Sequence, residues 1–309
     1  MADAAIRTEQ LVKNYGRNRG LAGLDLTVDS GEVYGFLGPN GAGKTTTIRL
    51  LLDLIRPTSG TARVLGRDPR VDGVALRRQI GYLPGDFVVD GQQTGHELLT
   101  YLGNLRGGVP RARIDEYAGR LDLDLGRKIK SLSKGNRQKI GVVQAFMHSP
   151  DLLILDEPTS GLDPFLQQQV VVMIRDAKAN GQTVFMSSHV MSEVQQTADR
   201  VGIIREGRLI AVERVEDLRE RSVRRVEIQF EAPVRPTEFS GLPGVSDVSV
   251  DPTGTILHCR LNGRADALVK AAGRHTVVNI LSEEPDLEEL FFHYYNHTSR
   301  ESSEASHAA

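Results

Sequence analysis

Short apolar runs alternate with longer segments of helical periodicity up to about residue 220. The runs predict β-strands, and the segments, in which apolar residues recur every three to four positions, predict α-helices. Near-continuous apolar strands such as Leu152–Leu155 fit a sheet that is buried on both faces. The order of elements therefore predicts an α/β domain. The predicted strands are Val33–Leu37, Ile80–Leu83, Leu152–Asp156, Thr183–Ser187 and Val201–Ile204; the predicted helices are Lys44–Ile55, Gly95–Leu105, Arg111–Leu121, Lys134–Met147, Pro164–Ala179 and Met191–Ala198; a hairpin turn is predicted at Arg205–Arg208.

The pattern changes after Ser222, where shorter, half-exposed strands replace the apolar runs. A small α+β domain over residues 222–296 is predicted to follow the domain of residues 1–221. Residues 297–309 are rich in Ser, Glu, Ala and His, with too little apolar content to pack, and we expect them to be disordered. The predicted strands are Arg225–Glu231, Val245–Val250, Thr255–Leu261 and Thr276–Leu281; the predicted helices are Arg264–Gly273 and a closing helix, Asp286–Tyr295.

Composition excludes several broad classes of protein. The 309 residues include 38 Lys+Arg and 40 Asp+Glu, and the net charge of -2 argues against a nucleic-acid partner. No apolar run is long enough for a membrane-spanning helix, and the first ten residues lack the pattern of a secretory signal. Cys259 is the single cysteine, which excludes an internal disulfide. We therefore expect a protein that is neither secreted nor integral to a membrane. We also expect it to work in a reducing compartment.

A glycine-rich motif follows the predicted strand Val33–Leu37 and opens the next helix. Its sequence, GPNGAGKT, matches the phosphate-binding pattern G-x-x-x-x-G-K-[ST]. The glycines let successive backbone N–H groups turn toward a phosphate, and the helix N-terminus adds its positive end. We expect Lys44 to reach the β- and γ-phosphates and the Thr45 hydroxyl to bind Mg²⁺. The residues expected to bind the nucleotide are Gly38, Pro39, Asn40, Gly41, Ala42, Gly43, Lys44, Thr45 and Thr46.

Two acids, Asp156 and Glu157, end a buried strand further along the chain. Ligands bind at the carboxyl edge of open α/β sheets, so Asp156 is predicted to lie beside the phosphate loop and to hold Mg²⁺. Glu157 is then placed to orient an attacking water or to accept its proton. A charged strand end that only meets solvent is the alternative.

The run Leu132–Gln138, LSKGNRQ, lies shortly before the acidic pair and opens a helix. Together with the phosphate loop and the acids, in this order, it resembles the signature of ATP-binding cassette (ABC) ATPases. The resemblance implies a P-loop ABC-type ATPase domain over residues 1–221, with a helical subdomain at about residues 87–150. The remainder resembles the small C-terminal domain of drug-exporter and ABC-2-type ATPase subunits. A Ras-like GTPase is disfavoured because no N-K-x-D motif is present.

Further roles follow from this resemblance alone. Tyr15 resembles the aromatic residue that stacks on adenine, and His189 resembles the switch histidine that contacts the γ-phosphate. Ser133 and the Gly135 amide resemble the contacts that a partner subunit makes to the γ-phosphate, at a helix N-terminus that itself favours an anion. Ser160–Asp163 resembles the loop that crosses the dimer axis. The implied catalytic residues are Lys44, Glu157 and His189.

The sequence departs from the family pattern at two places. Gly85 and Asp86 follow Ile80–Pro84 where relatives usually carry Gln, so the residue that senses Mg²⁺ and the membrane partner is not assigned by the motif. Because Asp86 would add a negative charge near a triphosphate, we expect it to point toward the membrane partner or to bind through water. Lys134 and Asn136 replace the commonest Gly and Gln of the signature.

The leading hypothesis is the energising subunit of a membrane exporter of drugs, antibiotics or other hydrophobic compounds. The resemblance implies ATP and Mg²⁺ as ligands, a homodimer that encloses two ATPs, and a separate transmembrane permease docked on the helical subdomain. It places the chain at the cytoplasmic face of the cell membrane. The alternatives are an importer ATPase, and a soluble cassette protein that acts on ribosomes or DNA.

Overall fold

The computed structural model describes residues 4–89, 91–221 and 223–283. It divides into two compact units, residues 1–213 and 214–309, which we describe separately. The units separate between Glu213 and Arg214, eight residues before the boundary predicted from composition. Within the described residues, no helix combines the length and the apolar character needed to cross a membrane.

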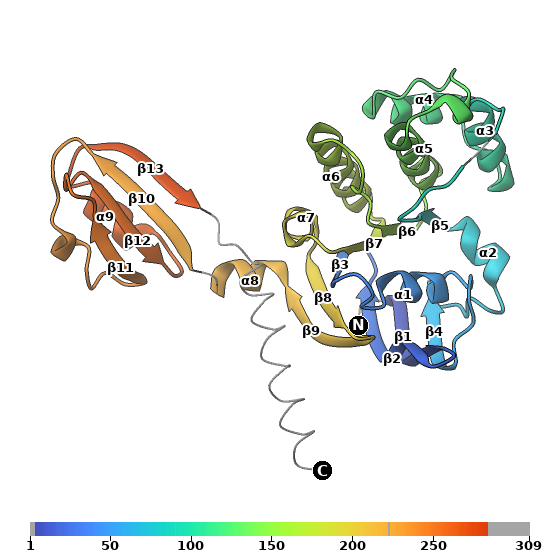
Figure 1. The fold of residues 1–309 in the computed structure, drawn as a ribbon, viewed down its shortest axis with the longest axis horizontal. Helices are drawn as coiled ribbons and strands as arrows, with labels where there is room; N and C mark the ends of the chain where they lie inside the picture. Colours follow the sequence, from blue (N-terminus) through green and yellow to red (C-terminus); the bar gives the residue numbers. More distant parts are fainter. Residues whose placement is uncertain (1–3, 90, 222, 284–309) are drawn as a thin grey trace, which may run out of the picture. The chain divides into compact units, whose positions relative to one another are not determined.

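The first unit is built on a six-stranded sheet in the order β5-β6-β7-β3-β8-β9 (Figure 1). Its first five strands run parallel, and β3, β6 and β7 are fully buried, as predicted from their apolar runs. Glu206 and Gly207, with φ of 48° and 76°, form the turn to β9 at the predicted hairpin. The α/β architecture is therefore confirmed. The strands are β3 (Val33–Leu37), β5 (Ile80–Leu83), β6 (Leu152–Asp156), β7 (Thr183–Ser188), β8 (Arg200–Arg205) and β9 (Arg208–Arg214).

A second, antiparallel sheet in the order β2-β1-β4 was not among the predicted elements. Its strands are β1 (Ala4–Tyr15), β2 (Asn18–Asp29) and β4 (Ser59–Val64). The apolar alternation of β1 is broken by bulges, one of them around Gln10, whose φ is 47°. Helix α1 (Lys44–Leu51) packs against β2 and β4 of this sheet and β6 of the other, so it lies between the two sheets.

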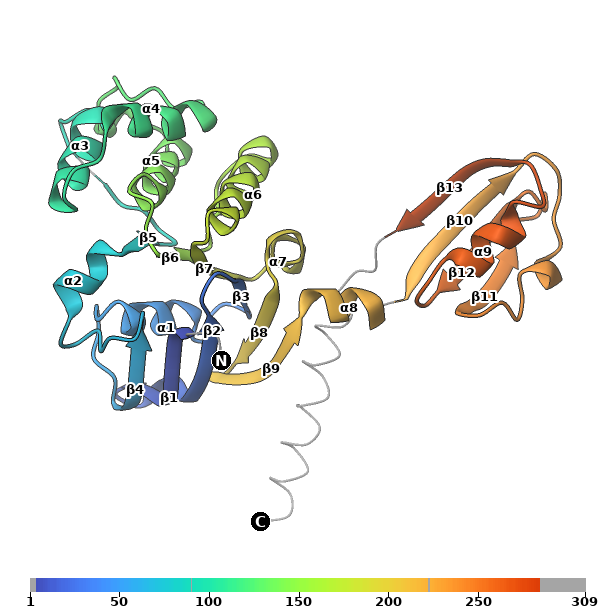
Figure 2. The same ribbon diagram turned by 180° about the vertical axis from the view of Figure 1, so that it is seen from behind.

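Three helices form a separate group in the first unit, seen on one side of the sheet in Figures 1 and 2. They are α3 (Gly95–Leu105), α4 (Arg111–Arg120) and α5 (Lys134–Phe146), with the short helix η1 (Ile129–Ser131) before α5. They pack on one another, and α5 also packs on β5. Thr94 starts α3 with a capping box, and Ser133 starts α5 by accepting the Asn136 N–H.

The remaining helices of this unit are α2 (Gly73–Arg78), α6 (Pro164–Ala179) and α7 (Met191–Thr197). The predicted helices match the structure within one residue at each end, except that Lys44–Ile55 was wrong in its last turn. Helix α1 ends at Leu51 because Asp53 adopts φ 55°, and the Leu54 N–H turns back to the Arg49 carbonyl at 2.8 Å.

The second unit holds a four-stranded antiparallel sheet in the order β11-β12-β10-β13. One face of the sheet packs together with α9, and their shared core includes Phe230, Leu257 and Leu268. The four strands and α9 confirm the elements predicted up to Glu283, whereas the predicted closing helix Asp286–Tyr295 and the tail 297–309 lie outside the described residues. The elements are α8 (Val215–Arg221), β10 (Arg224–Phe230), η2 (Pro236–Glu238), β11 (Val245–Val250), β12 (Ile256–Leu261), α9 (Asp266–Ala272) and β13 (Val277–Glu283).

Candidate active site

The glycine-rich loop lies between the end of β3 and the start of α1, and two of its glycines are required by geometry. A Cβ on Gly38 would lie 2.5 Å from the carbonyl oxygen of Ile204, closer than atoms can pack. Gly43, at the start of α1, has φ 115°, a backbone conformation that glycine adopts readily and residues with a Cβ rarely adopt. The Gly38 N–H also donates to the Ser188 carbonyl at 3.3 Å, so the loop is fixed against the ends of β7 and β8.

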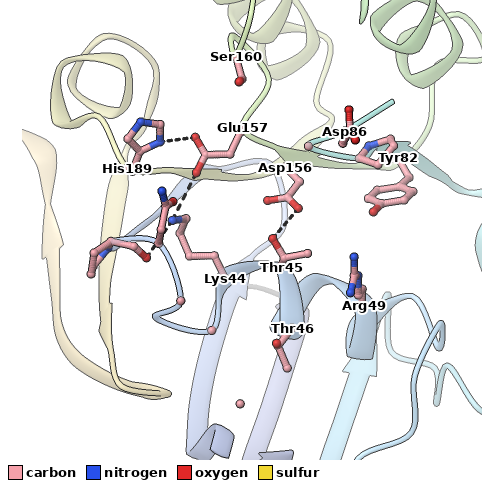
Figure 3. A pocket seen from close by; sticks show the side chains of 17 residues that line it. Lys44, Thr45, Thr46, Arg49, Tyr82, Asp86, Asp156, Glu157, Ser160 and His189 are labelled. Atoms are coloured by element: carbon pink, nitrogen blue, oxygen red, sulfur yellow. Dashed lines mark hydrogen bonds and ion pairs between the residues drawn. The ribbon is translucent and has the colours of Figure 1, made fainter. Parts of the chain in front are cut away.

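The Lys44 ammonium lies inside this loop (Figure 3). Its side chain is 6% exposed, and Nζ donates to the carbonyl oxygens of Gly38 at 2.6 Å and Pro39 at 3.2 Å. Nζ also lies 3.3 Å from Glu157 Oε1. A buried cation is thereby held against the backbone of the glycine-rich loop, an arrangement that suits a polyphosphate.

Asp156, at the end of β6, is held by two hydroxyl groups. Its Oδ2 accepts from Thr45 Oγ1 at 2.9 Å, and its Oδ1 accepts from Ser187 Oγ at 2.5 Å. Asp156 and Ser187 are buried, and Thr45 lies on the first turn of α1. Sequence analysis predicted the meeting of Thr45 and Asp156 but did not identify Ser187. These carboxylate and hydroxyl oxygens are the donors that a hard divalent cation prefers.

Glu157 connects the lysine to the predicted switch histidine. Its Oε2 lies 2.6 Å from His189 Nδ1, and its side chain is 19% exposed. Glu157 adopts φ 50°, a strained conformation for a residue with a side chain, and its N–H donates to the carbonyl and the hydroxyl of Ser187, each at 3.2 Å. The strained backbone directs the carboxylate into the space between Lys44 and His189.

These groups line an open cavity of about 540 Å³ (Figure 3). Three of its side chains, Arg49, Tyr82 and Pro84, were not among the predicted site residues. Arg49 follows Thr45 by four positions on α1, so helical periodicity could have indicated it. Burial, reinforced by the negative charge of Asp156, raises the pKa of Tyr82. The lining residues are Gly20, Pro39, Asn40, Gly41, Gly43, Lys44, Thr45, Thr46, Arg49, Tyr82, Pro84, Gly85, Asp86, Asp156, Glu157, Ser160 and His189.

The Gly85–Asp86 pair lies at the far wall of the cavity. A Cβ on Gly85 would lie 3.4 Å from Asp156 Oδ2, at ordinary contact distance. In Figure 3 the Asp86 carboxylate points away from the Thr45 hydroxyl. A side chain at residue 85 would thus start in van der Waals contact with Asp156, without a clash.

Five predicted site residues do not line this cavity: Gly38 and Ala42, which belong to the phosphate loop itself, and Tyr15, Ser133 and Gly135. Tyr15 is 46% exposed and lies next to it, since a Cβ on Gly20, a lining residue, would be 2.8 Å from the Tyr15 ring. Ser133 is exposed at the start of α5, and Gly135 faces the Gly161 carbonyl. The cavity of one chain therefore holds the phosphate loop, the acids and the histidine, without the signature residues.

Comparison with known proteins identifies the family. The family model described as ABC transporter matches residues 21–160. The chain is 34% identical over 304 residues to the daunorubicin resistance ATP-binding protein DrrA3 of Streptomyces coeruleorubidus, covering 95% of this chain and 96% of that protein. It is 39% identical over 231 residues to the bacitracin transport ATP-binding protein BcrA of Bacillus licheniformis, covering 73% and 74%.

Solved structures agree with this relationship. A structure described as the ATP-binding subunit of an ABC transporter superposes with a TM-score of 0.65 at 28% identity, covering 70% of this chain and 92% of that one. The order of phosphate loop, signature and acidic pair, the geometry of the cavity and these relatives agree. The chain therefore belongs to the ABC transporter family, as a cassette that binds and hydrolyses ATP.

Proposed function

We propose that this chain energises a membrane exporter that expels drugs, antibiotics or other hydrophobic compounds. The observation that carries the ATPase part of the proposal is the Lys44–Glu157–His189 cluster, in which a buried cation, a strained acid and a histidine converge on one cavity. Relatives named for daunorubicin resistance and bacitracin transport support the export part.

Each group of the cluster has a distinct role in hydrolysis. Lys44 neutralises the β- and γ-phosphates, and backbone N–H groups of the loop after Pro39 surround them. Glu157 accepts the proton of the attacking water or orients it, and His189, bonded to Glu157 in the structure, contacts the γ-phosphate. Tyr15 stacks on the adenine ring from its position beside Gly20.

Mg²⁺ fits the oxygens at the edge of β6. Thr45 and Asp156 already approach within 2.9 Å and provide a hydroxyl and a carboxylate, the donor types that Mg²⁺ binds. The ion would neutralise charge on the phosphates, and Ser187 keeps the Asp156 carboxylate oriented toward it.

Ser133 and Gly135 act on the nucleotide of a second copy of the chain. Both lie outside the cavity of their own chain, and their amides lie at the N-terminus of α5, which favours an anion. A homodimer would bring this helix end to the γ-phosphate bound by the partner, so that each of two sites combines residues of both chains.

A separate permease provides the transmembrane pathway, and the chain works at the cytoplasmic face of the membrane through it. The helical subdomain, about residues 87–150 of the cassette at 1–221, is the docking region in this proposal. Its exposed apolar side chains, Val88, Tyr101 and Leu105, are each more than half exposed and suit such a contact. The domain at 222–296 serves assembly or regulation.

Two experiments test the proposal in turn. Glu157→Gln should bind ATP like the wild type but lose steady-state turnover, whereas Glu206→Gln, at an exposed acid outside the cavity, should keep it. Wild-type turnover in Glu157→Gln would contradict the role of Glu157. Inside-out vesicles that hold the chain together with its permease should then accumulate daunorubicin or bacitracin with ATP. Accumulation of neither, with ATP turnover intact, would contradict export of these two kinds of compound.

A further inference from the structure

The carboxylate of Glu193, on α7, bridges two loops that lead to the active site. Its Oε1 accepts a short hydrogen bond from Thr159 Oγ1, and its Oε2 accepts from Ser188 Oγ at 2.7 Å. Thr159 and Ser188 are 4% and 0% exposed. Each oxygen of one carboxylate therefore holds a buried hydroxyl from a different segment of the chain.

These segments are the ones that carry the predicted catalytic pair. Thr159 follows Glu157 by two residues, and Ser188 immediately precedes His189. Two links thus connect the same two loops side by side. One is the Glu157–His189 contact of 2.6 Å, and the other runs from Thr159 through Glu193 to Ser188. The Ser188 carbonyl also accepts the Gly38 N–H, which ties the phosphate loop to the same point.

Glu193 bonds to hydroxyl groups rather than to a cation. In the part of the chain that the structure describes, it makes no ion pair, although acids on a helix surface often do. Hydrogen bonds from hydroxyls to a charged carboxylate are short and directional, so they fix the distance between two loops better than a flexible ion pair would.

We propose that Glu193 is a positioning residue for ATP hydrolysis, which sets the distance and angle between Glu157 and His189. The inference rests on the proposed roles of these two residues. Glu193 does not line the cavity and leaves the phosphate contacts of Lys44 untouched. Its loss should therefore lower the rate of the chemical step more than the affinity for ATP.

The test compares Glu193→Ala with Thr159→Val, Thr159→Ser and a neighbouring control on α7, Ser192→Ala. Glu193→Ala and Thr159→Val should each lower kcat about tenfold while KM for ATP changes less than about twofold. Thr159→Ser keeps the hydroxyl and should retain kcat, as should Ser192→Ala. The double variant Glu193→Ala/Thr159→Val should be no slower than the slower single variant, because both remove the same link.

The pH profile of kcat separates positioning from loss of folded protein. A changed Glu157–His189 contact should shift the profile in Glu193→Ala, whereas partial unfolding would lower its height without moving it. Unchanged kcat and pH profile in folded Glu193→Ala, with the wild type active, would overturn the inference. A wild type that does not hydrolyse ATP would instead refute the proposed function.

Discussion

Replacing Gly38 with alanine tests the geometry of the phosphate loop. The new methyl group would lie 2.5 Å from the Ile204 carbonyl oxygen and 2.8 Å from Ile204 Cγ2. Normal packing needs about 3.2 Å or more, so the loop or β8 would have to move by about 0.7 Å. Because β8 pairs with β3 up to Ile203, the residue directly before Ile204, the backbone resists this movement.

The expected cost of this overpacking is about 1–3 kcal/mol. For a unit of this size, it corresponds to a fall in Tm of roughly 2–12 °C. A loop displaced by a large part of an ångström should also bind ATP roughly 10- to 100-fold more weakly, because its amides no longer meet the phosphates.

Gly41→Ala is the matched control for stability. Gly41 has φ 82°, but a Cβ there would meet no protein atom within 4 Å, so alanine costs about 1 kcal/mol of backbone strain and no clash. Thermal unfolding of both variants without nucleotide, and fluorescence titration of Gly38→Ala with ATP, provide the comparison. A Gly38→Ala variant as stable as Gly41→Ala, with wild-type ATP affinity, would refute the reasoning.

Of four further predictions, three concern the site and one concerns the partly buried His148. Lys44→Ala should weaken ATP binding and lower turnover by about 10²-fold or more, and unchanged affinity in a fluorescence titration would argue against the phosphate-loop assignment. Gly85→Gln should be tolerated, since its Cβ would meet Asp156 at 3.4 Å, an ordinary contact distance. Asp86→Ala should lower permease-stimulated turnover more than basal turnover, because we expect Asp86 to point toward the permease. Equal losses of the two turnover rates would contradict this role of Asp86. Burial, followed by the nearby charge of Arg106, lowers the pKa of His148 from 6.5 to about 4, so the unfolded chain binds a proton that the folded chain does not. Denaturant unfolding should therefore show stability falling by about 2 kcal/mol from pH 7 to pH 5, and a loss of equal size in His148→Gln would contradict the assignment.

The sequence predicted the parallel sheet better than the antiparallel one, for a physical reason. Strands such as β6 are buried on both faces and appear as unbroken apolar runs. Strand β1 is longer, but its bulges shift the alternation and hide its period. The end of α1 was also predicted wrongly. The helix ends where Asp53 adopts a left-handed backbone conformation, and an Asp in the sequence does not indicate this conformation as a Gly would.

The site residues divide in the same way, into those that a sequence motif indicates and those that only the folded chain brings together. Lys44 and Glu157 lie in motifs whose neighbours in sequence indicate their chemistry. Ser187 and the Glu193–Thr159 bond arise where separate strands end at one edge, and the latter joins residues 34 positions apart. No local pattern encodes such a contact, so it emerges only when the sheet is assembled.

Mixing two inactive variants tests most directly the central claim, that ATP is hydrolysed in sites shared by two copies of the chain. Lys44→Ala removes the phosphate-loop cation, and Ser133→Arg is designed to block the signature helix end that we propose serves the partner. In a random mixture, half the dimers are mixed and each holds one complete site, so about a quarter of the wild-type sites are restored. ATP turnover in the mixture should rise well above that of either variant alone, up to about this fraction of the wild-type turnover. A mixture that forms dimers but is no more active than its separate components would contradict this claim.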